Sequence, residues 1–133
     1  MLLLIYMRLL GIDIGTKKTG LALSDPLGRL ALPYDVVKTK SLVEVVVDLC
    51  QTEGVEKIII GQSVNYQGQD NPVAKKAESL AKDIQIKTGL EIYWEPETLT
   101  SKEAERIIGR DEETDARAAA IILRNYLDRQ NYV

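Results

Sequence analysis

Residues 11–20 read Gly-Ile-Asp-Ile-Gly-Thr-Lys-Lys-Thr-Gly, a carboxylate in an apolar strand followed by a glycine turn with two lysines. Strand side chains alternate between faces, so the isoleucines share one face and Asp13, between two glycines, lies on the other. Residues 20–24 repeat this pattern, with leucines opposite glycine, alanine and serine. Asp13 is therefore expected on a bare sheet face with room for a large group. The structural alternative is a buried aspartate satisfied by turn amides.

The composition is that of a soluble globular protein, expected to form one domain over residues 1–133, with 45% hydrophobic and 28% charged residues. The formal net charge is −3 and there is no histidine. Proton transfer or metal binding must therefore use carboxylates, lysines, tyrosines or water. Cys50 is the one cysteine, which excludes an internal disulfide and a cysteine-rich zinc site and fits a reduced, cytoplasmic setting.

The first ten residues are mostly apolar but have no basic region and no small-residue cleavage site. They are also too few to cross a membrane as a helix. We therefore expect no membrane partner. Met7 is a second candidate start, with residues 1–6 as an N-terminal extension.

Alternating patterns and short turns predict three antiparallel strands at residues 7–15, 18–25 and 30–38. The period then becomes helical, with a capping box of Ser41 and Glu44 and an end at Gly54. The apolar run at residues 57–61 predicts a central strand buried on both faces.

A second helix is predicted from an Asn71 cap and Pro72 to about Gly89. Its expected buried stripe is Val73, Ala77, Leu80, Ala81 and Ile84. A fifth strand is predicted at residues 91–95, a short helix capped by Thr100 and Glu103, and a last helix from Thr114 to about Arg129. This order of elements predicts a three-layer α/β fold, a mixed five-stranded sheet with helices on both faces.

Three carboxylates have positions suited to chemistry, namely Asp13, Glu97 just past the fifth strand, and Asp115 in the first turn of the last helix. Residues 118, 119 and 122 share the face of Asp115 and are alanine, alanine and isoleucine. This small-residue face is expected to lie closely on the glycine-rich sheet face and bring Asp115 to Asp13. Three carboxylates without histidine or cysteine favour Mg²⁺ or Mn²⁺.

Each of these assignments has a competing interpretation. Asp115 also fits a first-turn acid that interacts with the helix dipole. Glu95 and Glu91 share the strand face of Glu97 by alternation. Lys17 and Lys18 are ordinary surface lysines in one interpretation and phosphate-binding groups in the other.

With these residues in place, residues 7–129 resemble the YqgF family of RNase H-like proteins, known as Holliday-junction-resolvase-like proteins and pre-16S rRNA nucleases. The family patterns D-x-G-T-K and G-x-A-x-S-D correspond to residues 13–17 and 20–25. Its glycine loop corresponds to residues 60–68, and the segment after its D-E-R to residues 99–104. Its terminal D-x-x-A-A-x-x-I-L helix corresponds to residues 115–123.

The resemblance implies an RNase H-like fold and a metal-dependent nuclease that trims the 5′ end of pre-16S rRNA. It implies Asp13, Glu97 and Asp115 as the acidic triad and selects Glu97 over Glu95 by register. Asp13 would bridge two Mg²⁺ or Mn²⁺ ions, and Glu97 and Asp115 would complete the coordination shells of these ions. Lys17 and Lys18 would hold a phosphate oxygen. On the glycine loop, Asn65 and Tyr66 would contact a sugar or a base.

The chain departs from the family pattern near the expected site. Pro96-Glu97-Thr98 replaces D-E-R, Ser63 replaces a loop proline, and Gln67 replaces an acid. The segment at residues 109–114 is short and mostly acidic. Less positive charge near the phosphate implies weaker nucleic-acid binding, a different substrate, or a partner that supplies the contact.

Three alternatives remain at this stage. A Holliday junction resolvase would cut branched DNA in place of an RNA precursor, and a non-catalytic module would bind RNA or ribosomal particles without turnover. The Asp-x-Gly-Thr turn also resembles the phosphate-binding hairpin of actin-like kinases, which need two such domains. The expected assembly is a monomer or a homodimer.

Overall fold

The computed structural model describes residues 7–62, 72–96 and 112–131, which form a mixed sheet covered by helices on both faces. The strands are β1 (Arg8–Ile14), β2 (Lys18–Ser24), β3 (Ala31–Lys38), β4 (Val55–Gln62) and β5 (Ile92–Pro96). The helical elements are the short 3₁₀ helix η1 (Thr39–Ser41), α1 (Leu42–Thr52), α2 (Pro72–Thr88) and α4 (Glu112–Asn131).

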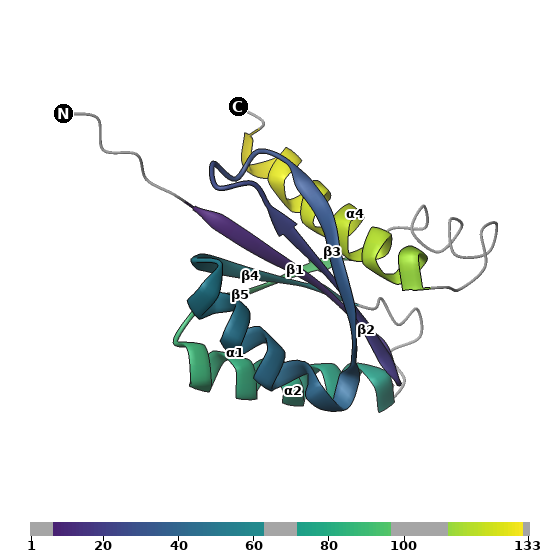
Figure 1. The fold of residues 1–133 in the computed structure, drawn as a ribbon. Helices are drawn as coiled ribbons and strands as arrows, with labels where there is room; N and C mark the ends of the chain where they lie inside the picture. The colour runs from purple at the N-terminus through teal and green to yellow at the C-terminus, as the bar shows by residue number, and fades with distance from the viewer. Residues whose placement is uncertain (1–6, 63–71, 97–111, 132–133) are drawn as a thin grey trace.

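The strand order is β3-β2-β1-β4-β5. Strand β2 pairs antiparallel with both β1 and β3, whereas β4 is parallel to β1 and β5 is parallel to β4. In Figure 1, α1 and α2 lie below the sheet and α4 crosses above it. The predicted three-layer α/β architecture with an antiparallel meander of three strands is confirmed.

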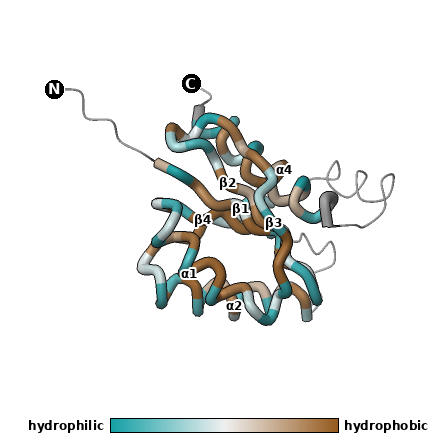
Figure 2. Tube along the Cα trace, in the orientation of Figure 1, coloured by the Kyte–Doolittle hydropathy of each residue, from teal (hydrophilic) through white to brown (hydrophobic). Residues whose placement is uncertain are grey.

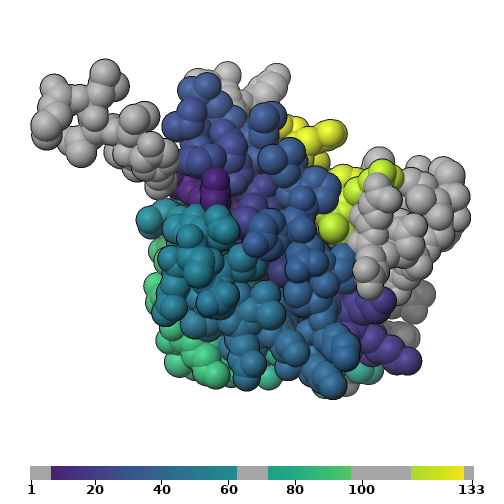
Figure 3. All heavy atoms as spheres, viewed as in Figure 1, coloured from purple at the N-terminus to yellow at the C-terminus, as the bar shows by residue number. Residues whose placement is uncertain are grey.

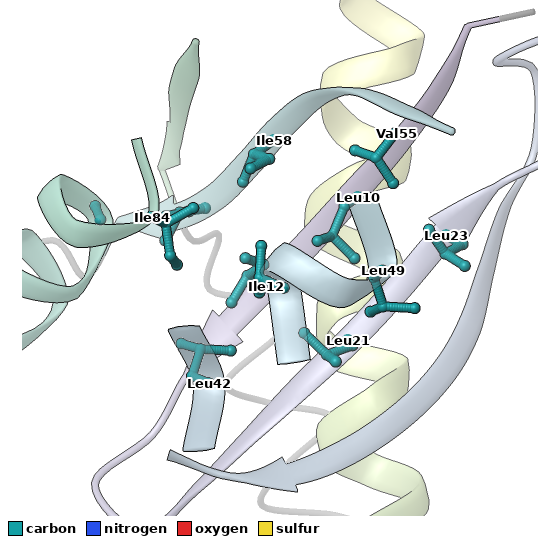
Figure 4. Close-up of a cluster of buried hydrophobic side chains, with 12 residues drawn as sticks. Leu10, Ile12, Leu21, Leu23, Leu42, Leu49, Val55, Ile58 and Ile84 are labelled. Carbon is teal, nitrogen blue, oxygen red and sulfur yellow. The ribbon is translucent and has the colours of Figure 1, made fainter. Parts of the chain in front are cut away.

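Strand alternation gives the sheet two apolar faces, each with its own core. On one face, Leu10 and Ile12 of β1 pack with Leu42 and Leu49 of α1 and with Ile84 of α2. Figure 4 shows the strand and helix side chains of this cluster gathered between the sheet and the helices, with α4 behind the sheet. Burial of this kind contributes about 25 cal/mol per Å² of apolar surface, so this cluster is the main source of stability on the lower face.

The other face packs against α4. Leu9, Ala22 and Ile59 lie there beneath Ala119 and Leu123. Successive isoleucines at residues 58–60 of β4 belong to the two cores alternately and have 0% exposure. This confirms the prediction of a central strand buried on both faces, and Figure 2 shows apolar segments of the strands running through the middle of the molecule.

Three local predictions were wrong. Ser41 makes no side-chain cap hydrogen bond, because it ends η1 with φ −102° and ψ 3° rather than the extended conformation that a capping residue needs. Val73 is 38% exposed at the start of α2, although the rest of the predicted stripe is buried or partly buried. Helix α4 begins at Glu112, two residues before the predicted Thr114.

Glycines end the first two long helices as expected, since Gly54 has φ +65° and Gly89 has φ +72°. The predicted Asn71 cap and the helix capped by Thr100 and Glu103 lie outside the described residues. Strand β3 forms one edge of the sheet and lies at the surface between α1 and α4 in Figure 3. Over the described ranges, no helix is both long and apolar enough to span a membrane.

Candidate active site

Asp13 lies near the end of β1 on the face that α4 covers. Its backbone partner on β2 is Gly20. A Cβ atom added to Gly20 would lie 1.9 Å from the carbonyl oxygen of Asp115, the fourth residue of α4. The start of α4 therefore rests on β2 beside Asp13, and this contact requires glycine.

A second glycine sets the height of α4 over the sheet. A Cβ atom on Gly11 would lie 2.8 Å from Cβ of Leu123 and 2.9 Å from the carbonyl oxygen of Ala119. Ala118 and Ala119 are buried, as the predicted small-residue face requires. The close approach of the alanine face of α4 to the glycine face of the sheet is confirmed. Both Asp13 and Asp115 are partly buried at one end of this contact.

The turn between β1 and β2 is held from below by a buried threonine. The Thr39 hydroxyl donates to the carbonyl oxygen of Gly15 at 2.8 Å, and the Thr39 amide donates to the carbonyl oxygen of Lys17 at 2.9 Å. The hydroxyls of Thr19 and Thr39 are 2.9 Å apart. A Cβ on Gly15 would lie 2.3 Å from the Lys18 carbonyl oxygen, so the turn needs glycine there.

This anchored turn presents two cations. Lys17 and Lys18 are exposed, and the turn that carries them lies at the lower right edge of Figure 3. Lys76 near the start of α2 donates to the carbonyl oxygen of Thr16 at 3.4 Å, which places a further lysine beside the turn. No local pattern predicts this role for Lys76, since Lys76 is distant from the turn in the chain and lies in a helix with other lysines.

Glu95, the main competitor of Glu97, has a structural partner. It is 4% exposed on β5 and forms an ion pair with Arg129 near the end of α4. Ile12 pairs with Ile60 and Gly61 pairs with Glu95, so Glu95 lies two strand spacings, about 10 Å, from Asp13 at the same sheet level. The pair ties the far end of α4 to β5.

The other competitor, Glu91, is exposed and accepts a hydrogen bond from the hydroxyl of Tyr93. This hydrogen bond raises the pKa of Tyr93, with desolvation as a smaller contribution. Glu91 lies just before β5, whereas Asp13 is level with the end of β5. Glu91 is thus bound locally and distant from the glycine-rich face.

Asp25, which belongs to the family pattern, has a role in the turn between β2 and β3. Its carboxylate accepts hydrogen bonds from the amides of Arg29 at 2.6 Å and Leu30 at 2.8 Å. The hydrogen bond from Leu30 is the largest cause that lowers the pKa of Asp25. Ser24 accepts from the Leu9 amide at 2.8 Å and so joins β2 to β1.

Glu97, Asn65 and Tyr66 lie outside the described residues. Of the proposed acidic triad, the structure therefore places Asp13 and Asp115. Within residues 7–62, 72–96 and 112–131, no three acidic, histidine or cysteine side chains gather closely enough to hold a metal ion. The oxygen donors of the two placed acids have the chemistry that a hard divalent cation prefers.

A family model described as RuvX, Holliday junction resolvase, matches residues 7–129. The chain belongs to this family. RuvX is the family also called YqgF, so the resemblance drawn from the motifs is confirmed.

Curated relatives in the RuvX family carry the name "Putative pre-16S rRNA nuclease". The protein of Moorella thermoacetica is 34% identical over 92% of this chain and 96% of its own length. That of Clostridium perfringens is 36% identical over 92% of this chain and 98% of its own length. That of Syntrophus aciditrophicus is 36% identical over 92% of this chain and 89% of its own length.

Among solved structures, Thermus thermophilus RuvC is similar to this member of the RuvX family in fold. Its complex with a Holliday junction substrate has a TM-score of 0.62 at 20% identity and covers 95% of this chain and 97% of RuvC. A second RuvC structure has the same TM-score at 17% identity and covers 93% of this chain and 96% of RuvC. At these identities the likeness shows the fold, which is RNase H-like.

Proposed function

We propose that this protein is a Mg²⁺- or Mn²⁺-dependent endonuclease that cuts structured RNA, with the 5′ end of pre-16S rRNA as its substrate in the cytoplasm. The observation that carries the proposal is the seating of Asp115 on Gly20 beside Asp13. Membership in the RuvX family and the names of the curated relatives support the substrate class.

Asp13, Asp115 and Glu97 are the proposed ligands of the metal ions. Glu95 and Glu91 already have partners, Arg129 and Tyr93, which supports Glu97 as the third acid. When bound, divalent ions would supply a nucleophilic water at neutral pH and stabilise the leaving oxygen.

The protein's own residues would orient the substrate. Lys17 and Lys18 would bind non-bridging phosphate oxygens at the turn that Thr39 anchors from below. Asn65 and Tyr66 would contact the sugar or base next to that phosphate. The glycines at positions 11 and 20 let α4 lie close to the sheet, which would bring Asp115 to the side of Asp13.

Cleavage of a precursor containing the 5′ end of 16S rRNA, in the presence of Mn²⁺, tests the proposal. We expect Asp13→Asn and Asp115→Asn to lower the cleavage rate by at least about 10²-fold, because each removes a charge that the transition state needs. Asp48→Asn is the matched control, since Asp48 is exposed on α1 across the sheet. Equal cleavage by wild type and Asp13→Asn would refute the site.

A Holliday junction resolvase is the second candidate, because the matching family model carries that description. A four-way DNA junction assayed beside the RNA precursor separates the two activities. Binding of RNA without cleavage by any variant would support the non-catalytic module instead.

A further inference from the structure

A cavity of about 490 Å³ opens between α2 and the carboxyl ends of the parallel strands. The buried or partly buried part of its lining, here called the floor, includes Ile14, Trp94 and Ala77, whereas Gln62, Lys82 and Gln85 in the lining are exposed. The volume lies in the range of small-molecule binding pockets in proteins. Trp94 and Ile14 also pack against the lower core, so the floor of this cavity is fixed by the fold.

The cavity is next to the proposed active site but on the other face of the sheet. Ile14 follows Asp13 on β1, about 3.3 Å further along the strand. Gly61, which also lines the cavity, pairs with Glu95 at the level of Asp13. The cavity and Asp13 thus lie on opposite faces of the sheet at the same end of β1 and β4.

The chemistry of the lining suits a nucleotide. Trp94 supplies an aromatic ring, and Ala77 leaves the space over the floor open. Gln62 and Gln85 supply amide groups that both donate and accept hydrogen bonds, as base edges require. Lys82 supplies a cation for a phosphate, and Glu78, one helical turn before it, also lines the cavity.

Lysines of α2 lie both at the cavity and beside the β1–β2 turn. Lys76 lies six residues before Lys82 on α2 and donates to the carbonyl oxygen of Thr16. Thr16 precedes Lys17, the proposed phosphate contact. A nucleic-acid strand that meets Lys17 at the turn would therefore find further positive charge along α2 toward the cavity.

We propose that this cavity holds the base of an unpaired nucleotide in the substrate strand, next to the phosphate that is cut. The inference rests on the proposed nuclease function and adds a requirement for a single-stranded nucleotide at the cleavage site. Stacking on one aromatic ring tolerates different bases, so the cavity would select unpaired nucleotides over paired ones more than one base over another.

Trp94 is the one tryptophan in the chain, so tryptophan fluorescence reports on this cavity directly. The probe is a single-stranded oligoribonucleotide, with the fully paired duplex of the same sequence as comparison, both without divalent metal. We expect the single strand to change Trp94 fluorescence saturably and the duplex to leave it unchanged. Anisotropy of a labelled oligonucleotide measures total binding in parallel.

Two variants give the matched test. Lys82→Ala should weaken the affinity measured by fluorescence several-fold, whereas Lys87→Ala, the same charge change on α2 outside the cavity lining, should not. Ala77→Leu fills the cavity and should abolish the fluorescence change while anisotropy still reports binding at Lys17. A thermal melt checks that Ala77→Leu folds, and the lysine pair tests the proposal independently of that variant.

The possible results separate the cavity from the nuclease. A fluorescence change with the expected variant pattern supports the cavity even if no RNA is cut. An oligonucleotide that binds without altering Trp94, equal losses in the two lysine variants, or no binding at all overturns it. A free mononucleotide that binds as tightly as the oligonucleotide also overturns it, because it would indicate a small-molecule site.

Discussion

Substituting alanine for Gly20 should displace the start of α4 and, with it, Asp115. The new Cβ atom would lie 1.9 Å from the Asp115 carbonyl oxygen, whereas ordinary van der Waals contact begins at about 3.4 Å. The two backbones must therefore separate by roughly 1.5 Å. Overpacking of this size costs about 1–3 kcal/mol. A misplacement of about 1 Å at a catalytic group costs about 10²-fold in rate.

The assay compares urea denaturation with the rate of RNA cleavage at a temperature where every variant is folded. Gly54→Ala is the control, because Gly54 has no atom within 4 Å of its Cβ position but has φ +65°, so alanine there is strained without touching the site. It should lose about 1 kcal/mol of stability and keep its cleavage rate. Wild-type stability in Gly20→Ala, or a rate unchanged despite lower stability, would refute the reasoning.

Three further predictions concern the surroundings of the site. Arg129→Ala should lower the free energy of unfolding by about 2 kcal/mol, because it leaves the Glu95 carboxylate buried without its partner; the loss is smaller than for a fully buried pair because Arg129 is 60% exposed. Adding Glu95→Gln should restore part of that loss, and additive effects of the two substitutions would contradict the ion pair. Thr39→Val should cost about 1–3 kcal/mol in chemical denaturation, because the hydroxyl that donates to the Gly15 carbonyl is 2.8 Å away and Thr39 is 1% exposed; a neutral effect would show that the turn does not depend on this contact. Asp25 has a lowered pKa in the folded protein, so its contribution to stability is present above the unfolded pKa of about 3.9 and is lost as pH falls through the folded pKa. The difference in unfolding free energy between wild type and Asp25→Asn should therefore be constant near neutral pH and shrink in acid. A difference that grows in acid would contradict the assignment.

The sheet and its two cores could be predicted from the local sequence, because the alternation of side chains between the faces of a strand depends only on neighbouring residues. Apart from Leu9, the leucines and isoleucines of β1 and β2 point to one face and the glycines to the other, so the close approach of α4 was predictable from residues 11 and 20. The Ser41 cap was not, because a 3₁₀ turn precedes α1 and changes the backbone conformation at that residue.

The surroundings of the candidate site depend on how α4 crosses the sheet, which no local pattern encodes. The Glu95–Arg129 pair joins residues 34 positions apart and forms because the end of α4 reaches β5. The exposure of Val73 is a second example, since Val73 lines the cavity between α2 and the sheet and is 38% exposed, whereas the helical period alone predicts a buried residue. Such contacts require the tertiary arrangement.

The contact of Asp115 with Gly20 joins the first two strands to α4, the last helix in the order of elements. Domains form from the N-terminal end during synthesis, so β1 and β2 emerge from the ribosome long before α4. A nascent or truncated chain without α4 has Asp13 but lacks the carboxylate proposed to complete the site. We therefore expect RNA cleavage to begin only after α4 has been made, so that shorter copies do not act as stray nucleases.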